Sequence, residues 1–175
     1  GVDHIWFADD NLSIKKKRIL SLCDDIVKSG LHKKCSFDAQ TRADGVNEEV
    51  LAAMKRANFR TISYGIEVAT DRLMKMINKS ETVEDCERAI KMSHDAGLDV
   101  AGTFIFGWPT ETDEDRKAAF DLALRLDMDT VRFNNATPYP GTALYDWVKD
   151  EPGFNPGHRW KNMNTVGALV SHPFK

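Results

Sequence analysis

Hydrophobic and polar residues alternate in blocks along the chain, and each block has the length of a regular element. Short apolar runs of about four to eight residues predict buried β-strands. Between them lie longer, mostly polar stretches in which apolar residues recur three or four positions apart, as on one face of a helix. The pattern predicts five strands, at residues 5–8, 35–40, 61–66, 99–106 and 130–134, with helices between them.

Residues that start and end helices stand where this alternation requires them. The expected N-caps are Ser13, Asn47, Thr70, Thr82 and Thr112. Thr82 and Asp85 approximate a capping box, and Gly30 and Gly97 are expected to end helices. The first helix is expected to share an apolar face of Ile19, Leu20, Cys23, Ile26 and Val27, and the helix after Thr112 is expected to carry Ala119, Phe120, Ala123 and Leu124.

Strands that alternate with helices about every 30 residues pair in parallel through crossover connections, so the sequence predicts an α/β domain. A doubly wound sheet and a segment of a (β/α) barrel both fit five β/α units. A closed TIM-type barrel needs eight, so the barrel interpretation requires an open barrel or a truncated chain, and the start at a strand favours truncation. We expect residues 1–150 to form this domain and residues 151–175 to be an extension or the start of a following segment.

Composition and charge restrict the compartment and the partners. A chain of 175 residues with 42% hydrophobic content suffices for one domain, and no window is long and apolar enough for a membrane helix. The net charge of −3 makes a nucleic-acid partner unexpected, and the basic run at residues 15–18 is interpreted as a solvated helix face. Cys23, Cys35 and Cys86 are odd in number and widely spaced, which favours reduced thiols in a cytoplasmic protein.

Polar residues follow each predicted strand, where parallel α/β folds gather their functional groups. They are Asp9 and Asp10, Gln40 and Arg42, Glu67, residues 107–111, and Asn134. Carboxylates at such a rim can bind an ammonium or ribose hydroxyls, and cations can bind a carboxylate. No zinc spacing among the histidines, no phosphate-binding loop and no nucleophile elbow occurs in the sequence.

Four motifs in order resemble those of radical S-adenosylmethionine (radical SAM) enzymes, in particular the branch whose members often carry a cobalamin-binding domain ahead of the barrel. They are Phe-Ala-Asp-Asp-Asn at residues 7–11, Gly-Ile-Glu at 65–67, Phe-Ile-Phe-Gly-Trp-Pro-Thr-Glu-Thr at 104–112 and Pro-Tyr-Pro-Gly-Thr at 138–142. The resemblance covers residues 2–148. It implies a partial TIM-type barrel and an enzyme that cleaves S-adenosylmethionine reductively at a 4Fe-4S cluster, forming a 5'-deoxyadenosyl radical that methylates, rearranges, cyclises or thiolates an unactivated carbon.

In that superfamily a CxxxCxxC loop after the first strand binds three cluster irons, because soft thiolates suit iron. This sequence contains no such loop, and its first strand resembles the second of the family. We therefore expect the cluster ligands upstream of residue 1 and an inactive fragment, and we assign no metal ligand here. Cys23 and Cys86 are expected in the core, and Cys35 at the end of the sheet away from the site.

The resemblance also implies roles for particular residues, none of which we assign as catalytic. Asp9 or Asp10 would bind the amino group of the cofactor, and the sequence leaves open which. The expected cofactor-binding residues are Asp9, Asp10, Arg42, Glu67 (ribose), Lys79 (carboxylate), Thr103, Gly107 and Pro109 (adenine and ribose); Asn134 and Tyr139 are expected to face the substrate. Alternatives stay open: loop or cap roles for Asp9, Asp10 and Glu67, substrate contact for Arg42, and plain turns at residues 107–109 and 138–141.

Other partners follow less directly. We expect a small-molecule or lipid-like substrate, an electron donor such as flavodoxin or ferredoxin, and self-association through the edge that truncation would expose; cobalamin use stays open. Two alternatives also stay open: an ordinary (β/α) barrel lyase or isomerase using strand-end carboxylates, and a non-catalytic binding module of the same fold.

Overall fold

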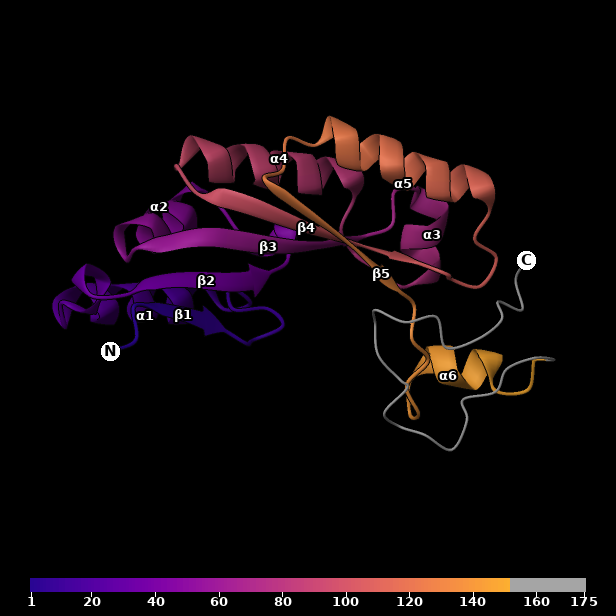
Figure 1. Ribbon diagram of the computed structural model, residues 1–175, viewed down its shortest axis with the longest axis horizontal. Coiled ribbons are helices and arrows are strands. Elements are labelled where there is room, and N and C mark those ends of the chain that lie inside the picture. Colours follow the sequence, from indigo (N-terminus) through magenta and orange to yellow (C-terminus); the bar gives the residue numbers. More distant parts are fainter. Residues whose placement is uncertain (152–175) are drawn as a thin grey trace.

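A computed structural model of the chain describes residues 1–151 and shows one curled parallel sheet (Figure 1). Its strands are β1 (His4–Phe7), β2 (Ser36–Thr41), β3 (Phe59–Glu67), β4 (Asp99–Phe106) and β5 (Thr130–Asn135). They are ordered β1-β2-β3-β4-β5, and every neighbouring pair is parallel. The prediction of an α/β fold in the form of a partial barrel is confirmed.

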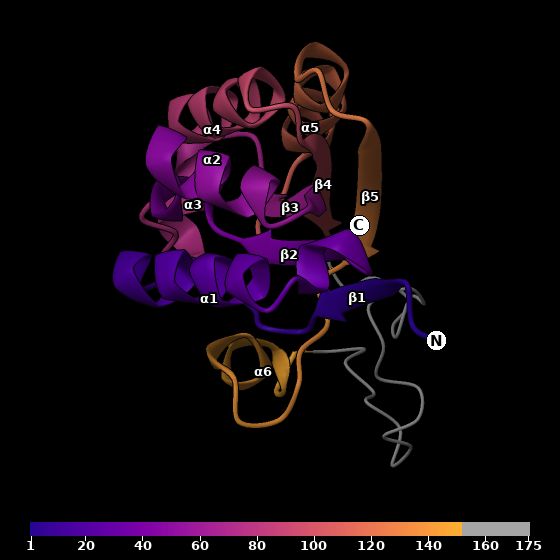
Figure 2. The same cartoon turned by 90° about the vertical axis from the view of Figure 1, so that its left-hand side faces the viewer.

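The helices follow the strands along the chain, and most of them lie along the outer face of this curl. They are α1 (Lys16–Lys28), α2 (Glu48–Arg56), α3 (Asp71–Met76), α4 (Val83–Asp95), α5 (Asp113–Arg125) and α6 (Ala143–Val148), with short 3₁₀ helices at Leu31–Lys33 and Ala43–Gly45. Figure 2 shows the strands curling from β1 round to β5, with α1, α2, α4 and α5 outside them. Helix α6, which was not predicted, lies apart from these four.

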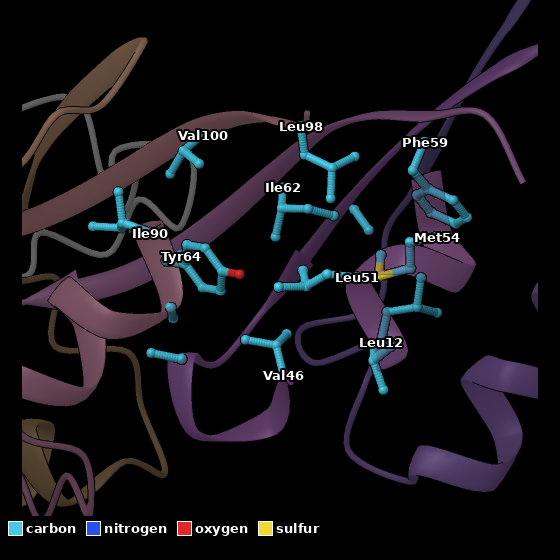
Figure 3. Packing of buried hydrophobic residues seen from close by; sticks show 14 of the residues in the cluster. Leu12, Val46, Leu51, Met54, Phe59, Ile62, Tyr64, Ile90, Leu98 and Val100 are labelled. Carbon is cyan, nitrogen blue, oxygen red and sulfur yellow. The ribbon is translucent and has the colours of Figure 1, made fainter. Parts of the chain in front are cut away.

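The core fills the space between the sheet and these helices, because alternate strand residues point to opposite faces. In β3, Ile62, Tyr64 and Ile66 are fully buried, whereas the residues between them are only half-buried. Figure 3 shows Ile62 and Tyr64 packed with residues of the neighbouring helices. The Tyr64 hydroxyl meets Ser93 Oγ of α4 at 2.8 Å, so this buried polar group has a partner.

Four of the five predicted N-caps are confirmed. The side chains of Asn47, Thr70, Thr82 and Thr112 each accept a hydrogen bond from the backbone three residues on. The expectation for Ser13 is wrong: α1 begins at Lys16 without a side-chain cap, and the Ser13 hydroxyl is buried against Thr41 Oγ1 at the end of β2.

The apolar face expected for the helix now seen as α5 is partly wrong. Ala119 and Leu122 are buried, but Phe120 is 50% and Leu124 87% exposed. Phe120 reaches the sheet only at its margin, where its ring meets Phe106 and Phe133. All but the first residue of the extension expected at 151–175 lie outside the described residues.

Within residues 1–151 no helix is long and apolar enough to cross a membrane. The basic run at the start of α1 is exposed, and two of its members pair with acidic side chains: Lys16 with Glu49 at 2.5 Å and Arg18 with Asp9 at 3.2 Å. This arrangement agrees with the interpretation of a solvated helix face.

Candidate active site at the strand ends

Glu67 ends β3 in an unusual backbone conformation. Its φ of 69° lies in the left-handed region, and the register with β4 shifts between Gly65 and Glu67. Strain of this kind in a non-glycine residue persists where the surrounding structure imposes it, commonly at functional sites. Because Gly65 has no Cβ, the Glu67 carboxylate can fold back over the strand.

The Glu67 carboxylate is buried, and its Oε2 has no hydrogen-bond partner within the described residues. Burial raises the pKa of Glu67, Lys79 acts to lower it, and Glu81 raises it further, so the pKa lies above its ordinary value. A buried acceptor without a donor is costly, and a ligand that donates a hydrogen bond would remove that cost.

Lys79 follows α3 and reaches back to the same strand. Its Nζ donates to the Gly65 carbonyl oxygen at 2.5 Å and lies 3.0 Å from Glu81 Oε2. The Lys79 side chain is 10% exposed and that of Glu81 is fully buried. The structure therefore brings Glu67 and Lys79 together around Gly65.

Arg42 follows β2, and its donors are largely occupied. Its Nε lies 2.9 Å from Asp44 Oδ1 and 3.2 Å from Glu81 Oε1, and its Nη2 donates to Asp44 Oδ2 at 2.7 Å and to Ser80 Oγ at 2.6 Å. This pairing makes Arg42 a link between the end of β2 and the segment before α4. Sequence reasoning missed Glu81, whose only sequence signal is a carboxylate between Lys79 and the cap of α4.

Asp9 and Asp10 follow β1 and have different surroundings. The Asp9 carboxylate accepts from both Nη atoms of Arg18 at 3.2 Å. No hydrogen bond or ion pair of the Asp10 side chain occurs within the described residues, and Asp10 is exposed. Of the two, Asp10 is the one free to meet a ligand.

The segment after β4 makes a turn that a carboxylate closes. Gly107 has φ 87°, and its N–H donates to Glu111 Oε2 at 2.8 Å. Arg116 also reaches Glu111 Oε2, at 3.3 Å, and Pro109 is buried within the turn. Gly107 is needed here because the backbone enters the left-handed region.

A second network ties this turn to the start of α3. Arg72 donates to the carbonyl oxygen of Thr110 at 3.0 Å and also pairs with Asp115, while Thr70 Oγ1 donates to Asp115 Oδ1 at 2.9 Å. Burial acts to raise the pKa of Asp115, but hydrogen bonds from Thr112, Thr70 and Arg72 hold it below its usual value. The loops after β3 and β4 are therefore held as one unit.

The remaining predicted residues lie on or beside the inner face of the curl. Thr103 pairs in register with Gly65 on one side and Arg132 on the other, and Asn134 pairs with Ile105. Phe133 stacks with Phe104 and Phe106 on the helix side, so its neighbour Asn134 faces the opposite way.

Tyr139 is 39% exposed and belongs to the turn before α6. Its carbonyl oxygen accepts bonds from the N–H of Thr142 at 3.1 Å and from Thr142 Oγ1 at 2.6 Å.

The cysteines lie apart from this rim. Cys23 and Cys86 are fully buried on α1 and α4, where burial raises their pKa to about 11 and about 12. The Cys35 thiol donates to the Val2 carbonyl oxygen at 3.1 Å, next to the start of β2. Among residues 1–151 no group of three His, Cys, Asp or Glu side chains could hold a metal ion.

The fold and rim define a segment of a parallel (β/α) barrel with a charged site at its strand ends. The model of the Radical SAM superfamily matches residues 4–123, and the chain belongs to this superfamily. Family membership confirms the resemblance and does not favour the alternative of an ordinary barrel lyase or isomerase.

Two curated relatives match most of the chain. The chain is 37% identical over 148 residues to an uncharacterized methyltransferase of Pyrococcus horikoshii. The aligned region is 85% of this chain and 32% of the relative. It is 28% identical to the anaerobic magnesium-protoporphyrin IX monomethyl ester cyclase of Cereibacter sphaeroides, over 86% of the chain and 25% of the relative. The chain thus spans about a third or less of these relatives.

Solved structures show the same fold. The radical SAM methyltransferase TsrM from Kitasatospora setae, solved with cobalamin and a [4Fe-4S] cluster, matches with a TM-score of 0.70 at 19% identity, over 78% of this chain and 28% of that one. The radical SAM enzyme HemN from Escherichia coli also matches with a TM-score of 0.70, at 16% identity, over 85% of this chain and 35% of that one.

Proposed function

We propose that this chain forms the S-adenosylmethionine-binding side of the active site in a radical SAM enzyme that modifies an unactivated carbon. The observation that carries the proposal is the buried Glu67 Oε2, which lacks a donor and lies beside the Lys79 ammonium at the end of β3. Family membership supplies the cofactor class.

The described residues fit the groups of S-adenosylmethionine. Glu67 would accept a bond from a ribose hydroxyl, Lys79 would bind the carboxylate, and Asp10 would accept from the ammonium. Thr103 and the Gly107 turn would pack beside the adenine and ribose. Arg42 and Asp9 would support this set from behind, because other side chains already engage them.

The described residues do not fit the iron–sulfur cluster, because the three thiols are buried in different parts of the fold and belong to no group that could hold a metal ion. When a cluster is bound beside it, S-adenosylmethionine supplies a 5'-deoxyadenosyl radical. The residues of this chain would hold and orient the cofactor, and we assign no electron-transfer step to them.

The reaction class follows the relatives only in part. Their names describe two methyltransferases, a cyclase and a methylthiotransferase, and these names have no substrate in common. We propose carbon modification in the cytoplasm with a small electron-transfer protein, such as a flavodoxin or ferredoxin, as reductant. Two of the structural neighbours contain cobalamin, which makes its use by the whole protein part of the proposal.

An apolar cavity beside the rim supports a substrate with an apolar part. Its volume is about 320 Å³, and it is lined mainly by Met76, Ile77, Trp108, Leu144 and Trp147. The Trp108 indole N–H is buried without an acceptor within the described residues. A flat or lipid-like group would suit this cavity.

Calorimetric titration of the chain with S-adenosylmethionine tests the cofactor assignment. We expect binding that Glu67→Gln or Lys79→Met weakens about tenfold or more, because each removes a charge-assisted contact. Glu84→Gln, an exposed glutamate in the first turn of α4, is the matched control and should bind as the unmodified chain does. Absence of binding, or equal losses in all three variants, would overturn the assignment.

A further inference from the structure

Glu81 is a fully buried carboxylate that meets two cations from different parts of the chain. Its Oε1 lies 3.2 Å from Arg42 Nε, and its Oε2 lies 3.0 Å from Lys79 Nζ. The Asp44 N–H also donates to Oε1 at 3.4 Å. Glu81 therefore connects the end of β2 to the segment after α3.

Such burial needs a reason, because a carboxylate taken out of water is costly unless it is paired. The pairing restrains the two flexible cationic side chains, Arg42 and Lys79, at the strand ends. An ammonium has three N–H donors. Lys79 gives one to the Gly65 carbonyl oxygen, and its contact with Glu81 is an ion pair without a hydrogen bond, since Glu81 Oε2 has no hydrogen-bond partner within the described residues. The two partners leave at least one donor for a ligand.

A second carboxylate competes for the same ammonium. The Glu67 carboxylate lies over Gly65, close to Lys79 Nζ, and these opposite charges attract. Without Glu81, Glu67 would remain beside the Lys79 ammonium as a competing anion. The two groups would then neutralise each other and leave neither free to bind a ligand.

We propose that Glu81 is a positioning residue that keeps Lys79 from closing a direct ion pair with the neighbouring Glu67, so that the ammonium presents a free donor to the carboxylate of the cofactor. This inference rests on the proposed function, since it assumes S-adenosylmethionine as the ligand. Glu81 itself would touch no cofactor atom.

Comparing the binding of two ligands distinguishes a positioning role of Glu81 from a general role in stabilising the fold. The probes are S-adenosylmethionine and its decarboxylated analogue, both titrated calorimetrically into the chain. We expect Glu81→Gln to weaken S-adenosylmethionine about tenfold, the order of pairwise coupling within one ion-pair network, and to change binding of the analogue less than twofold. Asp44→Asn is the matched control: it removes the charge of the second carboxylate that pairs with Arg42, and it should leave the ratio of the two affinities unchanged.

A double variant tests whether Glu81 acts through Lys79. Once Lys79→Met has removed the ammonium, adding Glu81→Gln should cause no further loss of S-adenosylmethionine binding. Additive losses, or equal losses for the two ligands in Glu81→Gln, would overturn the proposal. Glu81→Asp, which keeps the charge but shortens the side chain, replaces Glu81→Gln if thermal unfolding shows that the latter does not fold.

The outcomes also separate this inference from the proposed function. If the unmodified chain binds neither ligand, the assignment of the cofactor fails, and the positioning role fails with it. If the unmodified chain binds S-adenosylmethionine more tightly than the analogue and Glu81→Gln keeps that preference, the proposed function stands and the role of Glu81 alone is overturned.

Discussion

The two faces of the sheet differ although the same five strands build both. The helix-facing side of β2 and β3 presents Phe37, Phe59, Ile62 and Tyr64, all at most 1% exposed. The inner side of the same two strands presents polar or small residues and carries Glu67 at its edge, with a strained backbone and an oxygen that has no hydrogen-bond partner within the described residues. The helix-facing side packs in the core, whereas the inner side carries polar groups that take no part in core packing. The comparison shows that the residues that pack the core and the residues proposed to bind the cofactor come from opposite sides of the same strands.

The largest expected effect comes from the helix-facing side. Phe59 packs against the rings of Phe7 and Phe37, so Phe59→Ala should lower the free energy of unfolding by about 3–5 kcal/mol through lost burial and a cavity. Urea denaturation measures it. The exposed neighbour Arg60 serves as the control, and a loss at Phe59 as small as that of Arg60→Ala would contradict the comparison.

A polar pair within the helix-facing side sharpens the contrast. Ser93→Ala leaves the buried Tyr64 hydroxyl without its partner and should cost about 1–3 kcal/mol. Tyr64→Phe removes that hydroxyl and should cost less, about 1 kcal/mol, because Ser93 keeps its bond to the Ala89 carbonyl. Thermal or urea unfolding of both variants measures the two losses. A larger loss in Tyr64→Phe than in Ser93→Ala would contradict the prediction.

Glu67→Gln is expected to act in the opposite direction on stability. Because the pKa of Glu67 is raised in the folded chain, the folded state binds the proton more tightly than the unfolded state. The stability contributed by that proton is present at low pH and is lost as pH rises from the ordinary pKa of a glutamate through the raised one. The variant should therefore be more stable than the unmodified chain at neutral pH and should lose this gain in acid.

Unfolding curves of Glu67→Gln and the unmodified chain at several pH values check this expectation. A difference that does not change with pH would contradict it. A gain in stability combined with weaker cofactor binding would be the expected trade at a functional site.

The smallest effect belongs to the margin of α5. Leu124→Lys should change the free energy of unfolding by no more than about 0.5 kcal/mol, because the side chain is 87% exposed. Leu122→Ala on the buried side of the same helix gives the contrast, with an expected loss of about 2–5 kcal/mol. Sedimentation velocity of the unmodified chain tests the predicted self-association. A single monomeric species at high concentration would contradict that prediction.

Much of the fold could be predicted from local patterns. The five strands appear within about two residues of their predicted bounds, and the caps at Asn47, Thr70, Thr82 and Thr112 are local interactions that a sequence displays directly. Ser13 could not be predicted, because the Thr41 hydroxyl that binds it lies on a different element. Phe120 and Leu124 were misjudged because helical spacing alone does not show how far the sheet extends beneath a helix.

The sequence by itself determined the order of strands and helices, the alternation that separates the packed face from the polar face, and the motifs that indicated the superfamily. Only the tertiary structure decided that Asp9 pairs with Arg18, that Arg42 is occupied, and that Glu81 lies buried between two cations. The reason is that ion pairs between distant residues depend on strand register and loop course. Charge and burial at such a site arise from elements that are brought together only when the sheet curls.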